Sequence, residues 1–213
     1  MIHPTAIVEP GAEVGARTAV WDSVHIRSGA VIGSDCIVGE KTYVAYDVRV
    51  GDLVKINAHV YLCAGVTIED GCMVAAGAVF TNEKSPRATD PDITALRPSD
   101  PTDRTLETVV RRGATIGANA TIGPGIELGE YCMVGMGAVA TRSVPAHGLV
   151  VGNPARLVGL VDRSGECVLR LGADEALPDE AQIECPGDGT LVVSGGQVTF
   201  RAASSSPSGP GRR

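Results

Sequence analysis

A six-residue period runs through most of this sequence and restricts its fold more than any other feature. In steps of six from Val8, every position as far as Phe80 is apolar, and the series returns from Val110 to Ala140. Two residues before each of these positions stands a small or β-branched residue. Residues two apart face the same side of a strand, so both members of each pair are predicted to point inward. A helix would instead space apolar residues by three and four.

The composition fits a narrow core that is repeated many times. Hydrophobic residues make up 44% of the chain but aromatic residues only 3%, and 27 of the 213 residues are glycine. We expect glycine after the apolar position because the chain bends there with an unusual φ. The glycines in this position are Gly15, Gly33, Gly39, Gly51, Gly117, Gly123, Gly129 and Gly135. A unit this short cannot bury its own inner face, so the units are predicted to stack into a solenoid.

Over about residues 2–160 the sequence resembles the hexapeptide-repeat family of left-handed parallel β-helix proteins. The resemblance implies an all-β fold with three six-residue faces per coil, and a homotrimer. Residues 18 apart should then stack, in four coils from 8 to 79 and two from 110 to 145. We expect a β-helix domain at 1–161, a small C-terminal β extension at 162–203 with strands near LVV and QVTF, and a disordered tail at 204–213.

The repeat fails between Phe80 and Val110. Continued steps of six would bury Pro86 and Asp92, which a core would not tolerate. The sequence therefore predicts a loop at 83–107 that leaves the β-helix and returns to it. Loops of this length are functional or disordered, so an acceptor-binding loop and a tolerated surface insertion both remain open.

Charge and cysteine content restrict the partners and the compartment. The net charge of −7 argues against nucleic-acid binding, which leaves a basic footprint. No apolar run approaches the roughly 18 residues of a membrane span, and the first residues lack the pattern of a secretion signal. The six cysteines form no CxxC pair, so we expect reduced thiols and a cytoplasmic protein. Only Cys167 and Cys185 lie in the extension, too few for a structural zinc, and we expect no metal.

The segment VVGNPARLVG (150–159) is similar to the closing motif of the acyl-CoA transferases in this family. The resemblance implies that Arg156, with Arg142 as a second candidate, faces the phosphates of coenzyme A, which the planar fork of arginine suits. It also implies an adenine-flanking turn made by Gly152, Asn153, Pro154 and Ala155. Backbone amides beside small residues would hold the pantetheine arm, at Ala120, Gly135, Gly137 and Ala138. Alternatively, GNPA only turns the chain off the last coil.

The segment FTNEKSPRA (80–88) resembles the FTN-x3-PR-A/S motif of one branch of these transferases. That branch N-acetylates nucleotide-linked amino sugars, notably 3-amino hexoses and hexuronates, for surface polysaccharides such as lipopolysaccharide O-antigen. The resemblance implies acetyl-CoA as co-substrate and Asn82 as a catalytic residue, since an amide can accept from an amine and donate to an oxyanion. Asn82 could instead cap a turn of the loop. The branch often has Tyr-Glu where Cys63-Ala64 stand here, so the acceptor sugar stays open.

Steps of 18 stack the outward residue His25 on Tyr43 and Tyr61, a ladder that would face the acceptor or another subunit. We expect Tyr61, His59 and Arg87 to bind the acceptor. An amine acceptor needs positioning more than a strong base, so His25 is only the reserve base.

Three other functions remain open. An O-acetyltransferase of the same fold would require a true general base, for which His25 is the candidate. A metalloenzyme like the γ-carbonic anhydrases would need three converging histidines, whereas the spacing between His25 and His59 is not near a multiple of 18. A non-catalytic β-helix would need neither FTN nor GNPAR.

Overall fold

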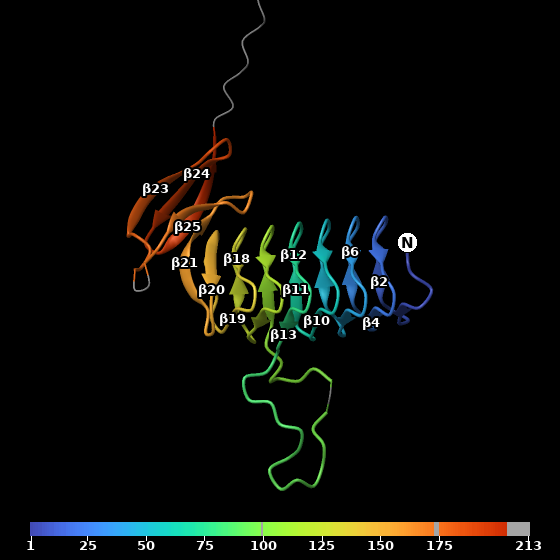
Figure 1. Ribbon diagram of the computed structural model, residues 1–213. Coiled ribbons are helices and arrows are strands. Elements are labelled where there is room, and N and C mark those ends of the chain that lie inside the picture. Colours follow the sequence, from blue (N-terminus) through green and yellow to red (C-terminus); the bar gives the residue numbers. More distant parts are fainter. Residues whose placement is uncertain (99, 173–174, 204–213) are drawn as a thin grey trace, which may run out of the picture.

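The computed structural model describes residues 1–98, 100–172 and 175–203, and these residues form an elongated prism with a small sheet at one end (Figure 1). Secondary structure in the described ranges consists of strands β1 to β25, so the predicted all-β class is confirmed. The described residues contain no helix that is long and apolar enough to cross a membrane. The predicted tail at 204–213 lies outside the described residues.

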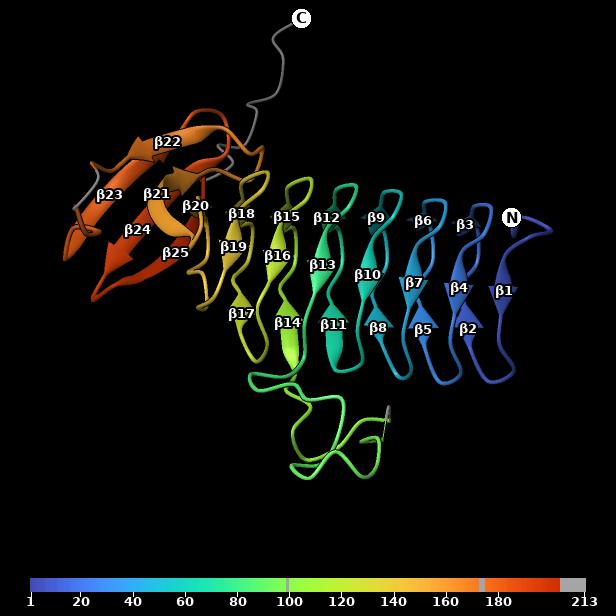
Figure 2. The ribbon, with the colours of Figure 1, turned by 60° about the horizontal axis from the view of Figure 1, so that its bottom comes forward.

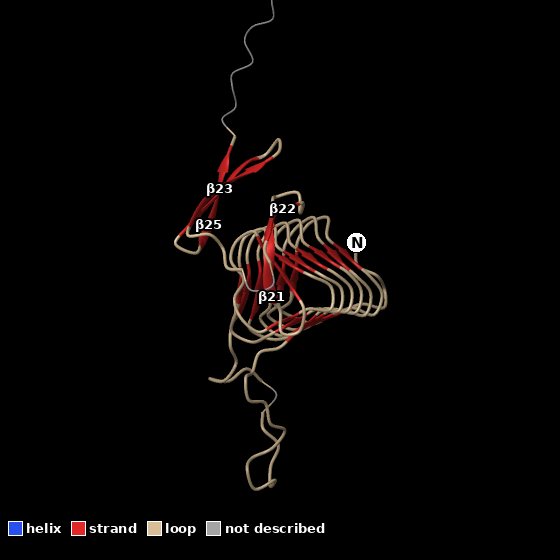
Figure 3. Cartoon of the chain, turned by 60° about the vertical axis from the view of Figure 1, so that its left-hand side comes forward, coloured by secondary structure: helices blue, strands red, loops and turns tan. Residues whose placement is uncertain are grey.

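Three parallel sheets form the faces of the prism, as the end-on view in Figure 3 shows. The first face contains β1 (Ile7–Val8), β4 (His25–Ile26), β7 (Tyr43–Val44), β10 (Tyr61–Leu62), β13 (Val79–Phe80), β16 (Thr121–Ile122) and β19 (Val139–Ala140). The second contains β2 (Glu13–Val14), β5 (Val31–Ile32), β8 (Arg49–Val50), β11 (Val66–Ile68), β14 (Thr108–Val110) and β17 (Glu127–Leu128). The third begins with β3 (Ala19–Val20), β6 (Ile37–Val38), β9 (Lys55–Ile56), β12 (Met73–Val74), β15 (Thr115–Ile116) and β18 (Met133–Val134).

The register between coils follows the predicted step of 18. His25 pairs with Tyr43, and Tyr43 pairs with Tyr61. At the predicted loop the step changes, because Val79 pairs with Thr121, far beyond one regular step. The loop therefore lengthens one coil while the strands on either side still stack. Figures 1 and 2 show it projecting from the prism.

The glycines that follow the apolar positions do not have the expected role. None of these eight glycines, all inside the described ranges, has a positive φ. Positive φ falls instead on the residue before most of the small inward residues, as at Leu53 (φ 58°). A Cβ on Gly15 would lie 2.5 Å from the carbonyl carbon of Gly33, and one on Gly117 would lie 2.5 Å from the amide nitrogen of Met136. The expectation of an unusual φ was wrong, and glycine is needed because successive coils approach too closely for a side chain.

After β18 the chain first adds strands to the third face and then leaves the prism. β20 (Gly148–Val151) is parallel to β18, whereas β21 (Arg156–Val161) and β22 (Cys167–Arg170) add antiparallel strands. A separate antiparallel sheet follows, made of β23 (Glu180–Cys185), β24 (Gly189–Ser194) and β25 (Gln197–Ala202). The strands near LVV and QVTF are thus present, joined by the turn at 195–196. Leu160 of β21 packs with Leu191 and Val193 in the small core of this extension. The sheet therefore sits against the last coils (Figure 2).

Candidate active site

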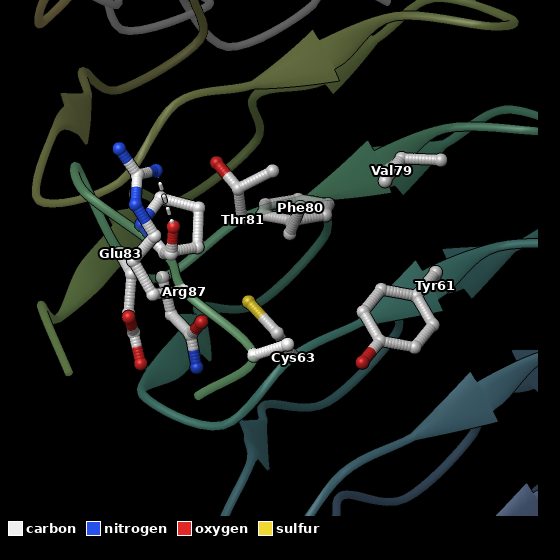
Figure 4. Close-up of a pocket in the computed structure, with 10 residues that line it drawn as sticks. Tyr61, Cys63, Val79, Phe80, Thr81, Glu83 and Arg87 are labelled. Atoms are coloured by element: carbon white, nitrogen blue, oxygen red, sulfur yellow. Dashed lines mark hydrogen bonds between the residues drawn. The ribbon is translucent and has the colours of Figure 1, made fainter. Parts of the chain in front are cut away.

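The excursion loop and the first face enclose a groove at the corner where the chain leaves β13. One part is a cavity of about 650 Å³ beside the end of β13, between Tyr61 and Arg87 (Figure 4). It is lined by Tyr61, Cys63, Val79, Phe80, Thr81, Asn82, Glu83, Pro86, Arg87 and Ala88. A second cavity of about 360 Å³ shares Tyr61, Cys63, Asn82 and Glu83 with the first and continues over Tyr43 and Tyr46. We call these two adjoining cavities the loop groove. They bring together Asn82, Tyr61 and Arg87, three of the predicted site residues.

Asn82 is held in one orientation at the centre of the loop groove. Its side-chain Nδ2 donates to the carbonyl oxygen of Ala64 at 3.1 Å. The backbone carbonyl oxygen of Asn82 accepts a hydrogen bond from the backbone amide of Leu106 at 2.8 Å, and this bond closes the base of the loop. Because a carbonyl can only accept, the amide orientation is fixed, and Oδ1 and one N–H remain for a ligand.

Glu83 is a site residue that the sequence analysis missed. Its half-buried carboxylate lines both parts of the loop groove and a further cavity of about 280 Å³ with Lys84 and Arg104. Figure 4 shows Glu83 and Arg87 on one side of Cys63 and Tyr61 on the other. The signal was present in the sequence, since Glu83 directly follows Asn82 in FTNEKSPRA. A carboxylate beside an amide suits a positively charged amine.

Tyr61 and Cys63 give the groove a neutral floor. Burial raises the pKa of the Cys63 thiol to about 11. Burial also raises the pKa of Tyr61, with smaller contributions from Cys63 and Tyr43. Both side chains are therefore uncharged near neutral pH.

The predicted aromatic ladder is present along the first face. The His25 and Tyr43 rings meet edge to face with centroids 5.6 Å apart. Tyr43 stacks on Tyr61 with centroids 5.3 Å apart, so the ladder ends at the loop groove that Tyr61 lines.

His25 has a carboxylate partner that the sequence analysis did not identify. Its Nε2 lies 2.9 Å from Oε1 of Glu9. The strand partner of His25 on the preceding coil is Ile7, so the contact with Glu9 is diagonal between coils. The pKa of Glu9 is lowered by the amide of Ser28 and further by His25 and Arg27.

The ladder does not bring His25 to Asn82 within one chain. His25 is on β4 and Asn82 follows β13, three strands along the first face. At about 4.8 Å per strand the separation is roughly 14 Å. His59 is also apart from Asn82, because it forms the left-handed corner (φ 59°) that enters β10, while Asn82 lies at the corner that leaves β13. His59 lines neither part of the loop groove.

Arg142 and Arg156 meet at a cavity of about 170 Å³. Arg142 comes two residues after β19, as Asn82 comes two residues after β13, so both lie at the same corner of the prism. The strand order β13-β16-β19 puts them two coils apart, roughly 10 Å. The adjoining turn is exposed at Gly152, Asn153 and Pro154, and Gly152 has φ 95°.

The small residues predicted to offer backbone amides are already hydrogen-bonded. The amides of Ala120 and Ala138 donate to the carbonyls of Gly117 and Gly135, both at 3.2 Å. Those of Gly135 and Gly137 donate to Val150 and Ala118, both at 2.8 Å. The side chains of Ala120 and Ala138 are completely buried in the prism. These four residues therefore offer no free backbone N–H to a pantetheine arm, and their place in the lining of its groove stays a prediction.

No cluster of three or more His, Cys, Asp or Glu side chains placed to hold a metal ion occurs among the residues that the structure describes.

A parallel prism with an external groove at one corner defines a class of hexapeptide-repeat proteins, and comparison with known proteins identifies the family. The model for "Bacterial transferase hexapeptide (six repeats)" matches residues 47–82 and 107–142. The dTDP-3-amino-3,6-dideoxy-alpha-D-galactopyranose 3-N-acetyltransferase of Aneurinibacillus thermoaerophilus is 39% identical over 161 residues, 75% of this chain and 78% of that protein. This chain belongs to the bacterial hexapeptide-repeat transferases, which confirms the resemblance.

Two further matches are more partial. An acyl-[acyl-carrier-protein]–UDP-N-acetylglucosamine O-acyltransferase of Brucella ovis is 39% identical over 61 residues, 29% of this chain and 22% of that protein. Among solved structures, PerB from Caulobacter crescentus, in complex with CoA and GDP-perosamine, matches with 23% identity and a TM-score of 0.42. That match covers 74% of this chain and 56% of PerB.

Proposed function

We propose that this protein is an acetyl-CoA-dependent N-acetyltransferase that acts on the amine of a nucleotide-linked amino sugar of the 3-amino-hexose or hexuronate type. The proposal rests on the arrangement of residues at one corner of the prism. Asn82 in the loop groove and Arg142 in the cavity with Arg156 share that corner two coils apart. The 39% identity to a nucleotide-sugar 3-N-acetyltransferase supports the same reaction.

The donor end of the site fits a phosphorylated thioester. Arg142 and Arg156 both line one small cavity beside the exposed turn at 152–154. Guanidinium groups bind phosphate oxygens in bidentate fashion, and among the described residues no acidic side chain lines this cavity to oppose them. An extended thioester held there would run along the corner toward Asn82.

The acceptor end of the site suits an amine. The Glu83 carboxylate attracts the ammonium form of the sugar amine, and loss of one proton makes the nitrogen nucleophilic. Once that first proton has passed to water, the nitrogen attacks the thioester carbonyl carbon and the C–N bond forms. The C–S bond then breaks, and the departing thiolate takes the second proton from the nitrogen and leaves as the coenzyme A thiol. Oδ1 of Asn82 accepts an N–H of the attacking amine, and its remaining N–H donates to the developing oxyanion. Catalysis is thus mainly positioning.

The setting of this reaction extends the proposal. The product would serve surface polysaccharide such as O-antigen, the enzyme would work in the cytoplasm, and it would assemble as a homotrimer. In such a trimer the loop at 83–107 would contact a neighbouring subunit.

An O-acetyltransferase is the second candidate, favoured by the His25–Glu9 pair at 2.9 Å. A carboxylate-oriented histidine is the usual general base for a hydroxyl acceptor. The roughly 14 Å between His25 and Asn82, from strand spacing, argues against their joint action within one subunit.

A thiol-release assay with acetyl-CoA and a panel of nucleotide amino sugars and their hydroxyl analogues tests the proposal. We expect turnover with an amine acceptor only. Asn82→Ala should reduce kcat by about 10²–10³-fold, the usual cost of one oxyanion donor. Asn57→Ala, on the third face, is the matched control and should retain activity. Turnover that survives Asn82→Ala but is abolished by His25→Ala would contradict the proposal and support O-acetylation.

A further inference from the structure

A second crevice lies between the β-helix and the C-terminal sheet, and the proposed function does not use it. Its volume is about 410 Å³. The last coils contribute Arg112, Glu130, Tyr131 and His147, and the extension contributes Arg163 and Phe200. Residues 112 and 130 follow β14 and β17, so the crevice begins at the end of the second face, whereas Asn82 and Arg142 follow strands of the first. In Figures 1 and 2 the extension stands beyond β18 and β20.

His147 is a buried polar residue in the lining of this crevice. Its side chain is 2% exposed, and Nδ1 lies 2.9 Å from the carbonyl oxygen of Val161. Since a carbonyl only accepts, Nδ1 carries the proton, and Nε2 of the neutral ring is an acceptor. Among the described residues Nε2 has no hydrogen-bond partner, and His147 is one of the residues that line the crevice. The ring is fixed by stacking on Tyr131 at 5.5 Å and on Phe200 at 6.1 Å.

Burial favours the neutral form of this histidine and lowers its pKa. A neutral, fixed acceptor selects a ligand that donates, such as a hydroxyl group. The carboxylate of Glu130 is a second acceptor on the same wall.

The crevice also offers positive charge. The guanidinium of Arg163 lies 4.3 Å from the centre of the Phe200 ring and pairs with Asp188 through Nε at 2.9 Å. The side chain of Arg112 lines the crevice and has no acidic partner among the described residues; its backbone amide donates to Glu69 at 2.9 Å. Arg112 is therefore the cation available to an incoming anion.

We propose that this crevice binds a phosphorylated sugar, with the phosphate at Arg112 and sugar hydroxyls donating to Nε2 of His147 and to Glu130. The volume falls in the range of small-molecule sites. Tyr131 and Phe200 add apolar surface to the lining, while their ring faces contact His147 and, for Phe200, also Arg163. A free sugar phosphate and the sugar diphosphate of a nucleotide sugar share this chemistry.

Magnetic resonance of nitrogen-labelled histidine tests this site directly, because the chain has only four histidines. His147→Gln identifies the His147 signal by its loss. The probes are glucose 1-phosphate, UDP-glucose and inorganic phosphate, added separately. We expect the Nε2 signal of His147 to move in a saturable way with at least one sugar ligand. Movement with glucose 1-phosphate alone would identify free sugar phosphates, and movement with UDP-glucose alone would identify nucleotide sugars.

Two variants distinguish specific binding in this crevice from nonspecific attraction of the anionic ligand to arginine side chains. Arg112→Gln should raise the apparent Kd about tenfold, a loss near 1.4 kcal/mol. Arg49→Gln removes an exposed guanidinium on the second face and should leave the Kd unchanged. The proposal is overturned if the signal moves with no probe, moves equally with inorganic phosphate, or moves equally in Arg112→Gln. The test needs no acetyl transfer, so its outcome is independent of the proposed reaction.

Discussion

Single residues at the corners of the prism solve two different steric problems. Leu53 is 66% exposed and adopts φ 58°, a left-handed conformation that disfavours a branched side chain. Gly117 has an ordinary φ, but a Cβ there would lie 2.5 Å from the Met136 amide nitrogen on the next coil. The two positions therefore respond in opposite ways to substitution.

We expect Leu53→Gly to raise the free energy of unfolding by up to about 1 kcal/mol, because the left-handed penalty exceeds the entropy cost of glycine. We expect Gly117→Ala to lower it by about 1–3 kcal/mol through overpacking. Urea denaturation of both variants measures the difference. A loss of stability in Leu53→Gly, or none in Gly117→Ala, would contradict this account of the corners.

The Cys63 thiol gives a chemical test of the loop groove. With its pKa raised to about 11 by burial, Cys63 is protonated at pH 8, and its thiolate fraction grows only as the pH approaches 11. We expect slow alkylation by iodoacetamide at pH 8, faster alkylation at higher pH, and protection by a bound acceptor. Peptide mass spectrometry separates Cys63 from Cys167, which is more exposed. Rapid labelling of Cys63 at pH 8 would mean that the groove is more open than described.

At the scale of elements, the excursion loop lines only the acceptor side of the proposed site. Glu83, Arg87 and Asp100 line the loop groove, whereas none of the described loop residues lines the cavity of Arg142 and Arg156. We expect a short glycine-serine link in place of residues 84–105 to raise the acceptor KM at least about tenfold while the Kd for coenzyme A changes little. Steady-state kinetics and calorimetry measure the two quantities.

A smaller deletion is the control for this loop replacement. The backbones of Ala88 and Arg97 are joined by a 2.9 Å hydrogen bond, so the segment 89–96 forms a closed tip. That tip lines neither part of the loop groove. Deletion of this tip should leave the acceptor KM unchanged. If the larger replacement weakened acceptor binding and coenzyme A binding equally, the loop would not belong to the acceptor side alone.

At the scale of the whole molecule, we expect acid to weaken the docking of the C-terminal sheet, because His147 is buried beside it. Burial lowers the pKa of His147 in the folded protein below its unfolded value of about 6.5. The folded state therefore disfavours the protonated ring, and stability present above pH 6.5 is lost as the pH falls toward the folded pKa. Glu130 and Asp188 favour protonation and Arg163 opposes it, but burial dominates.

Urea denaturation between pH 8 and pH 5 measures this linkage. We expect His147→Gln to be less stable than the natural protein at pH 8 and to lose less stability on acidification. Parallel pH profiles for the two proteins would show that other groups cause the acid sensitivity.

The features that follow from the six-residue period could be predicted from the sequence. The contacts that depend on how closely neighbouring coils approach could not. Steps of 18 correctly stacked His25 on Tyr43 and Tyr61, because a solenoid repeats the same geometry at each coil. The Glu9 contact to His25 is diagonal, and the period contains no information about diagonals. The occupied amides of Ala120 and Ala138 were likewise missed, since hydrogen bonds to neighbouring residues and coils cannot be counted from spacing. Glu83 was overlooked although it lies within the predicted motif.

The long insertion after β13, which leaves the strand pairing on either side unchanged, has an evolutionary consequence. A prism that tolerates such an excursion at one corner can exchange that segment by recombination while the remaining coils stay intact. Descendants of one ancestral scaffold could in this way acquire new acceptors and inherit the same donor. Grafting loops between homologues is accordingly a practical route to engineered sugar specificity.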